Sequence, residues 1–172
     1  MAALSALASV QEANLVFQKA NIALDSLGAK GEVRDALRAL KAHLSQLKSN
    51  PNLRFTAIDA TSVATADDGQ SVGAGTARIY FVFLKKKATG TDAFVSVVDN
   101  GTDDNYYGGS LTGSVRYQVA LLEASEQTHA AWPAGLSFAN GIRVVATTAA
   151  AAGTTANAAA DGPDGFIISG AA

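Results

Sequence analysis

The first fifty residues carry the apolar spacing of amphipathic helices. Two stripes recur in alternating steps of three and four residues, the first formed by Leu7, Val10, Asn14, Phe17, Asn21 and Leu24 and the second by Val33, Leu37, Leu40, Leu44 and Leu47. Such spacing brings the members of a stripe onto one helix face. Gly28 falls between the stripes, and glycine ends helices because it adopts the left-handed conformation without a Cβ clash. The pattern predicts two short helices, the second ending near Pro51, since proline disfavours helix in the preceding residue.

The stripes admit two interpretations. One face of each helix packs on another element of the same chain, or the stripes join copies of the chain or a partner. Neither stripe spans more than about three heptads, which is short for a coiled coil. Asn14 and Asn21 lie one heptad apart. An asparagine inside such a seam fixes register and oligomer state, but both can equally face solvent. We take the apolar stripe residues, together with Asn14, as the candidate oligomer or partner interface.

Beyond the proline, the apolar period changes to that of strands. Seven short segments are predicted as strands: residues 53–57, 77–84, 93–98, 114–121, 135–138, 142–147 and 164–169. Asn140 and Gly141 form a strong tight-turn signal between two of them. Short strands separated by turn signals indicate an antiparallel sandwich or barrel, and no helical pattern interrupts them as a parallel α/β sheet requires. The chain is predicted to be mainly β, with a helical segment over residues 1–50 and a β domain over residues 51–172.

Charge and composition narrow the classes of partner. The net charge is -2 and no cysteine is present. Such a balance gives no global basic field for nucleic acid, and a chain without cysteine has neither a disulfide framework nor a thiolate metal site. The opening MAALSALASV lacks the basic region of a signal peptide, and no apolar run approaches the roughly 18–20 residues that span a bilayer. We therefore expect a protein made in a cytosol, with neither a nucleic acid nor a membrane as partner.

Candidate catalytic residues are few. The two histidines, His43 and His129, lie far apart in the sequence, and His43 falls in the second predicted helix. Around Ser137 the sequence Gly-Leu-Ser-Phe-Ala lacks the closing glycine of a nucleophile elbow. A serine-type triad needs a nucleophile, a histidine and a carboxylate side by side, and no local pattern supplies that set. We expect no catalytic site and no enzyme activity.

Metal and ligand motifs are also weak. Asp99, Asp103 and Asp104 offer clustered oxygens that suit calcium, but their order does not match the twelve-residue calcium loop, so a solvated turn is preferred. Residues 85–87 are three lysines after a strand, typical of an edge strand protected from aggregation. We expect no metal and no cofactor.

Four aromatic residues keep one binding alternative open. Tyr106, Tyr107 and Trp132 are candidates for stacking on a sugar, whereas Tyr117 alternates with apolar positions and is expected to be packed. A carbohydrate-binding module is therefore an alternative of a different functional class.

Three parts of the β region resemble a known family. Residues 135–147, GLSFANGIRVVAT, consist of an apolar strand, a tight glycine turn and a β-branched strand running into Ala-Thr. This segment resembles the closing hairpin of small jelly-roll proteins found in the virions of tailed bacteriophages. Residues 77–84 and 93–98 are similar to the opening pair of strands in that family, and residues 165–170 to its final strand.

The resemblance implies a fold and a function. It implies an antiparallel jelly-roll-like sandwich preceded by the helical segment. Proteins of this family often trimerise and sit on the capsid exterior as decoration, or cement, proteins. The implied partners are other copies of the chain and the major capsid protein. A head-fibre or tail-spike adaptor is the alternative within the same family.

Overall fold

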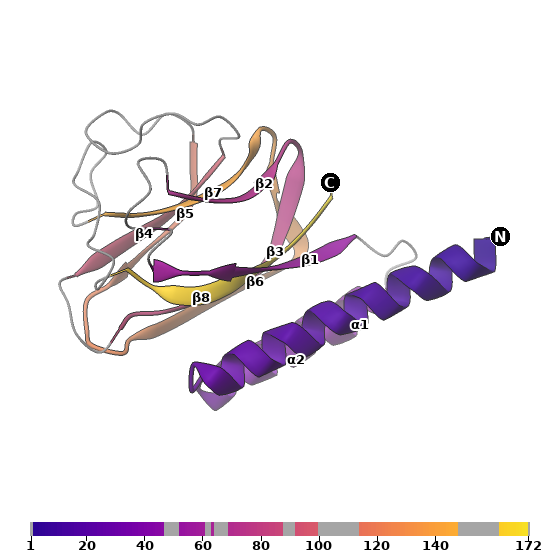
Figure 1. The fold of residues 1–172 in the computed structure, drawn as a ribbon, viewed down its shortest axis with the longest axis horizontal. Helices are drawn as coiled ribbons and strands as arrows, with labels where there is room; N and C mark the ends of the chain where they lie inside the picture. Colours follow the sequence, from indigo (N-terminus) through magenta and orange to yellow (C-terminus); the bar gives the residue numbers. More distant parts are fainter. Residues whose placement is uncertain are drawn as a thin grey trace.

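The computed structural model describes residues 2–46, 52–60, 63, 69–87, 92–99, 114–147 and 162–171, with the backbone alone for residues 2–9 and 114. Two helices come first, α1 (Ala2–Ser26) and α2 (Gly31–Leu44). The strands that follow are β1 (Leu53–Ile58), β2 (Gln70–Ala74), β3 (Ala77–Lys85), β4 (Ala93–Asp99), β5 (Ser114–Leu121), β6 (Gln127–Phe138), β7 (Gly141–Thr147) and β8 (Asp164–Ala171). Figure 1 shows the two helices side by side along one face of the β part.

The strands form two antiparallel sheets. Sheet A has the order β1-β8-β3-β6, and sheet B has the order β2-β7-β4-β5. The pairing is nested: β1 pairs with β8, β2 with β7, β3 with β6 and β4 with β5. A long antiparallel ribbon folded over itself into two four-stranded sheets is a jelly roll. The structure confirms the predicted mainly β, jelly-roll-like sandwich, and the described strands stay in two sheets rather than closing into a barrel.

A glycine separates the two helices as predicted. Gly28 has a φ of 63°. Its N–H donates to the Asp25 carbonyl at 3.1 Å, and the Ala29 N–H donates to the Leu24 carbonyl at 2.9 Å. These two bonds are the Schellman motif, in which a left-handed residue lets the chain satisfy the last helical carbonyls. Helix α2 ends at Leu44, earlier than the predicted end near the proline.

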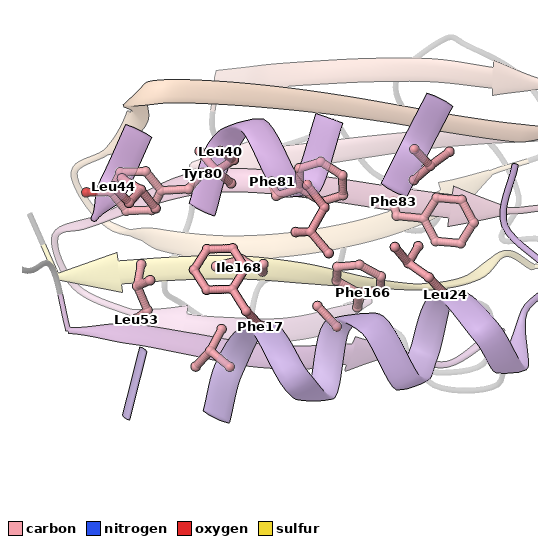
Figure 2. Packing of buried hydrophobic residues seen from close by; sticks show 14 residues of the cluster. Phe17, Leu24, Leu40, Leu44, Leu53, Tyr80, Phe81, Phe83, Phe166 and Ile168 are labelled. Atoms are coloured by element: carbon pink, nitrogen blue, oxygen red, sulfur yellow. The ribbon is translucent and has the colours of Figure 1, made fainter. Parts of the chain in front are cut away.

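Both helices dock on the outer face of sheet A, where α1 contacts β1 and β8 and α2 contacts β6 and β3. Figure 2 shows side chains of both helices pointing at the sheet. The buried residues of this layer are Val16, Phe17, Ala20, Leu24, Val33, Leu37, Leu40 and Leu44 from the helices and Leu53, Tyr80, Phe81, Phe83, Phe166 and Ile168 from the sheet.

Aromatic rings form the centre of this layer. The ring centroid of Phe166 lies 5.2 Å from that of Phe55 and 5.8 Å from those of Phe81 and Phe83. We call these four residues the aromatic row; it runs across β1, β8 and β3. Aromatic pairs at such separations add to the stabilisation from burial alone. Leucine and phenylalanine side chains of the helices cover the row, in which Phe81, Phe83 and Phe166 are fully buried and Phe55 is half-buried.

A second core fills the space between the two sheets, so sheet A is buried on both faces. This explains why residues 79–84 are a continuous apolar run in the sequence rather than an alternating one. A β-bulge shifts the register between Ile79 and Phe81. Tyr80 and Phe81 therefore both join the helix-facing core, whereas Ile79 and Val82 face sheet B. The extra residue at the bulge adds one more side chain to the layer under the helices.

The strand predictions differ from the structure in two places. The segment Gln70–Ala74, which forms β2, was not predicted as a strand, and β6 begins at Gln127 rather than near residue 135. Opposite the two-residue step from Ile79 to Phe81, β6 advances five residues, from Ala131 to Leu136. The intervening bulge contains Gly135 with a φ of 80°. Its irregular backbone breaks the period of two that would have identified one long strand.

The aromatic row gives a direct stability prediction. Phe166→Ala removes the ring that contacts the other three and leaves a cavity, so the free energy of unfolding should fall by about 3–5 kcal/mol. Phe94→Ala, at a half-buried position on β4 outside the helix layer, is the matched control and should cost less. Urea denaturation of both variants measures the difference. A loss for Phe166→Ala no larger than for the control would contradict the role given to the row.

Candidate functional site

Most of the predicted stripe lies inside the chain's own core. Phe17, Leu24, Val33, Leu37, Leu40 and Leu44 are each 3% exposed or less and pack on sheet A. For these six side chains the structure shows the first of the two interpretations, a helix face packed on another element of the same chain. Val10 is 51% exposed and Asn14 is also exposed. Leu7 belongs to the part of α1 with the backbone alone, and Leu47 lies outside the described residues. As an oligomer or partner interface, the stripe stays a prediction.

The turn between the helices is fixed to the sheet by polar side chains. Lys85 Nζ donates to the Leu27 carbonyl at 2.6 Å. The amide of Gln127 donates to the Gly28 carbonyl and accepts from the Lys30 N–H, both at 3.0 Å. Lys85 and Gln127 are neighbours across β3 and β6. This turn clamp orients the helix pair on sheet A, and nothing in the local sequence pattern predicted it.

The interpretation of the lysine cluster as edge protection was wrong. Strand β3 lies between β8 and β6 and is not an edge of the sheet. Lys86 is 2% exposed, and its ammonium donates to the Leu122 carbonyl at 3.1 Å and lies 3.7 Å from Asp92. The charge is held by specific acceptors where the chain leaves the sheet, as a buried ammonium requires.

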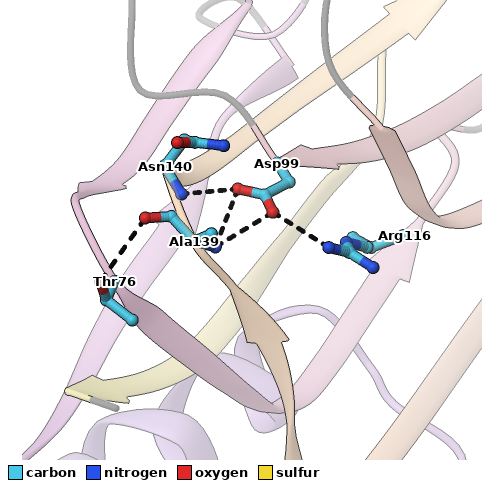
Figure 3. Close-up of polar contacts among 5 residues, drawn as sticks. All are labelled: Thr76, Asp99, Arg116, Ala139 and Asn140. Carbon is cyan, nitrogen blue, oxygen red and sulfur yellow. Dashed lines mark hydrogen bonds and ion pairs between the residues drawn. The ribbon is translucent and has the colours of Figure 1, made fainter.

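A buried carboxylate holds the turn between β6 and β7 (Figure 3). Asp99 accepts hydrogen bonds from the backbone N–H of Ala139 at 3.0 Å and of Asn140 at 2.8 Å, and from the Arg116 guanidinium at 3.2 Å. Burial raises the pKa of the Asp99 carboxyl, but these donors favour the carboxylate more strongly. The net effect is a pKa below the ordinary 3.8. The Asp99 carboxylate thus has an internal structural role.

The calcium hypothesis finds no support in the described residues. Asp99 is occupied by the contacts above, and Asp103 and Asp104 lie outside the described residues. Within the described ranges, no group of three or more His, Asp or Glu side chains is arranged to hold a metal ion.

The two histidines lie in separate environments. His43 is exposed on α2. His129 is on β6, and its ring centroid lies 6.2 Å from that of Phe81. In the described part of the chain, neither histidine forms a hydrogen bond with a hydroxyl or carboxylate. The structure does not bring together the predicted candidates for acid–base chemistry.

The one described candidate for sugar stacking, Trp132, packs on Tyr117, which was expected to be packed. Trp132 and Tyr117 meet edge to face, with ring centroids 5.3 Å apart and planes at 83°. Both are half-buried, and they close the seam between the edge strands β6 and β5. On the opposite side of the sandwich, Gln70 of β2 closes the seam between the edge strands β1 and β2. Its amide donates to the Ala57 carbonyl at 2.6 Å. Tyr106 and Tyr107 lie outside the described residues.

The described surface includes the following two hollows. One of about 300 Å³ lies where the end of α1 meets β1 and β8, beside Phe55 and Asp164. The other, of about 120 Å³, lies at one end of the sandwich and includes Arg54 and Ser169. Neither contains a predicted site residue.

Comparison with protein-family models, curated proteins and solved structures finds no match to this chain. Neither described helix is both long and apolar enough to span a bilayer.

The Asp99 contacts predict a pH dependence of stability. The pKa of Asp99 in the folded chain lies below its unfolded value near 3.8. Between these two pKa values the unfolded state therefore binds more protons than the folded state. The stabilisation is complete above the unfolded pKa and is lost as the pH falls through the folded pKa. Urea denaturation from neutral pH to below 3.8 should show this loss in the unaltered chain and a smaller one in Asp99→Asn.

Asp99→Asn should also unfold more easily at neutral pH, by about 1–3 kcal/mol, because buried donors lose a charged acceptor. The control is Asp35→Asn, whose side chain is 72% exposed. It should keep the pH dependence of the unaltered chain. Equal acid sensitivity in the unaltered chain and in Asp99→Asn would contradict the assignment.

Proposed function

We propose that this chain is a structural virion protein of a tailed bacteriophage. In this proposal it is a capsid decoration, or cement, protein that binds the capsid exterior as a homotrimer and stabilises the shell. Its partners are its own copies and the major capsid protein. The proposal assigns no enzymatic activity and no cofactor.

The nested jelly-roll pairing is the observation that supports the proposal most. The segments that resemble the phage proteins take distinct places in it. The closing hairpin, residues 135–147, supplies the end of β6 and all of β7, and the final strand is β8. A jelly roll alone hosts many unrelated functions. The resemblance of the segments adds the virion context that the fold by itself does not carry.

The use of the polar groups also supports a structural role. Asp99, Lys85 and Gln127 each bind backbone atoms of a distant segment and hold a turn in place. The helices are fixed to the sandwich by the core under them and by the turn clamp. A rigid body with a defined outer surface is suited to stabilise a shell by contact.

Binding to capsids tests the proposal. The purified full chain is mixed with capsids assembled from the major capsid protein of the same phage, and the mixture is pelleted. The chain should sediment with the capsids in a saturable, fixed ratio and should raise their melting temperature. The control is the chain pelleted alone. A chain that stays in the supernatant at every capsid concentration contradicts the proposal.

A further inference from the structure

The solvent side of α1 carries a second, unpredicted stripe. Leu15 is 51% exposed and Ile22 is 68% exposed. They lie seven residues apart, with Gln18 between them and Gln11 one turn before Leu15. The four residues follow one another at steps of four, three and four. At 3.6 residues per turn, this row faces about 180° away from the buried Ala20 and Leu24 side of the helix. We call Gln11, Leu15, Gln18 and Ile22 the α1 strip.

The spacing of the α1 strip is that of a helix–helix seam. Steps of four, three and four residues are the a and d positions of a heptad, which face a partner helix in a coiled coil. Counting back along the sequence, the same register falls on Ala8 and Leu4. Three of the five exposed large apolar residues in the described chain, Val10 among them, belong to α1. The apolar exposure is therefore concentrated on one helix rather than scattered over the surface.

The length of α1 leaves room for a partner. Its 25 residues extend for about 37 Å, whereas the 14 residues of α2 extend for about 21 Å. Figure 1 shows the amino-terminal end of α1 projecting past the strands and past α2. An isolated helix shorter than about 12–15 residues is only marginally stable in water. The few turns of α1 that project past the strands therefore gain little stability by themselves. Contact along the strip would stabilise the projecting turns.

The chemistry of the strip favours a second copy of this chain as the partner. A surface that meets itself must avoid placing like charges opposite each other, and the strip carries no charge. Its polar members are amides, and an amide has both donors and acceptors, so two identical strips can hydrogen-bond to each other. On its flanks, Asn14 and Asn21 lie on one side and the oppositely charged Glu12 and Lys19 on the other. Beyond Ile22 the register continues to Asp25, whose carboxylate is paired with Arg34 of α2.

We propose that the α1 strip is the seam through which copies of this chain assemble. The inference rests on the proposed function, because it names the surface that builds the homotrimer. It differs from the predicted stripe, of which Phe17, Leu24, Val33, Leu37, Leu40 and Leu44 pack on sheet A. Glutamine at every second seam position lowers the stability of the seam, as polar residues do in coiled coils.

Light scattering of the full chain tests the inference. The unaltered chain should have three times the mass of one 17.5 kDa chain. Leu15→Glu/Ile22→Glu places charge in the seam and should reduce the mass to that of a single chain. Glutamate is a good helix former, so α1 should persist, which circular dichroism checks. The matched control is Val115→Glu/Leu122→Glu, at exposed apolar positions outside α1. It should keep the trimer mass.

A cross-link gives an independent readout. The chain has no cysteine, so Leu15→Cys introduces a single thiol at the centre of the strip. Mild oxidation should yield a disulfide-linked pair of chains, and Leu122→Cys should yield none. Equal cross-linking of the two variants would contradict the seam.

The remaining outcomes separate this inference from the proposed function. A trimer that survives Leu15→Glu/Ile22→Glu overturns the seam but leaves the homotrimer standing. If that variant keeps its trimer mass and no longer sediments with capsids, the strip contacts the capsid and the inference is wrong. An unaltered chain that is a single chain in solution overturns both the seam and the homotrimer.

Discussion

The packing of two helices on the aromatic row of sheet A is the interaction on which the rest of the structure depends. Phe166 lies at its centre, with Phe55, Phe81 and Phe83 around it. Burying one such side chain contributes on the order of 1.5–3 kcal/mol. Without the helices, this face of the sheet would be a continuous apolar surface. The helical segment is therefore a layer of the core rather than an appendage of the sandwich.

The same packing determines what the helices present to solvent. Because Phe17 and Leu24 are held against the sheet, Leu15 and Ile22 are held outward. The turn clamp at Lys85 fixes the helix pair at one end, and the core fixes the part of the pair between Val16 and Leu44. Folding therefore orients the α1 strip, and assembly through it would need no rearrangement of the chain.

Periodicity predicted the helices, the strand-rich region and the glycine stop because each depends on local spacing. It did not predict what depends on distant segments. The partner of the helical stripe could not be identified, because an apolar face packs equally well on a sheet or on another helix. The bulge containing Gly135 hid most of β6, since the bulge breaks the alternation. The roles of Lys85 and Asp99 were missed for the same reason: their acceptors and donors come from segments far away in the sequence.

Native-state hydrogen exchange tests the central claim, that the helices and the sandwich form one cooperative unit. Amide protons of α2 between Val33 and Leu44 should exchange with the same free energy of opening as those of Phe166 and Ile168 in β8, because the two elements share one core. Exchange of the α2 amides through an opening of much lower free energy, with β8 still protected, would contradict the claim.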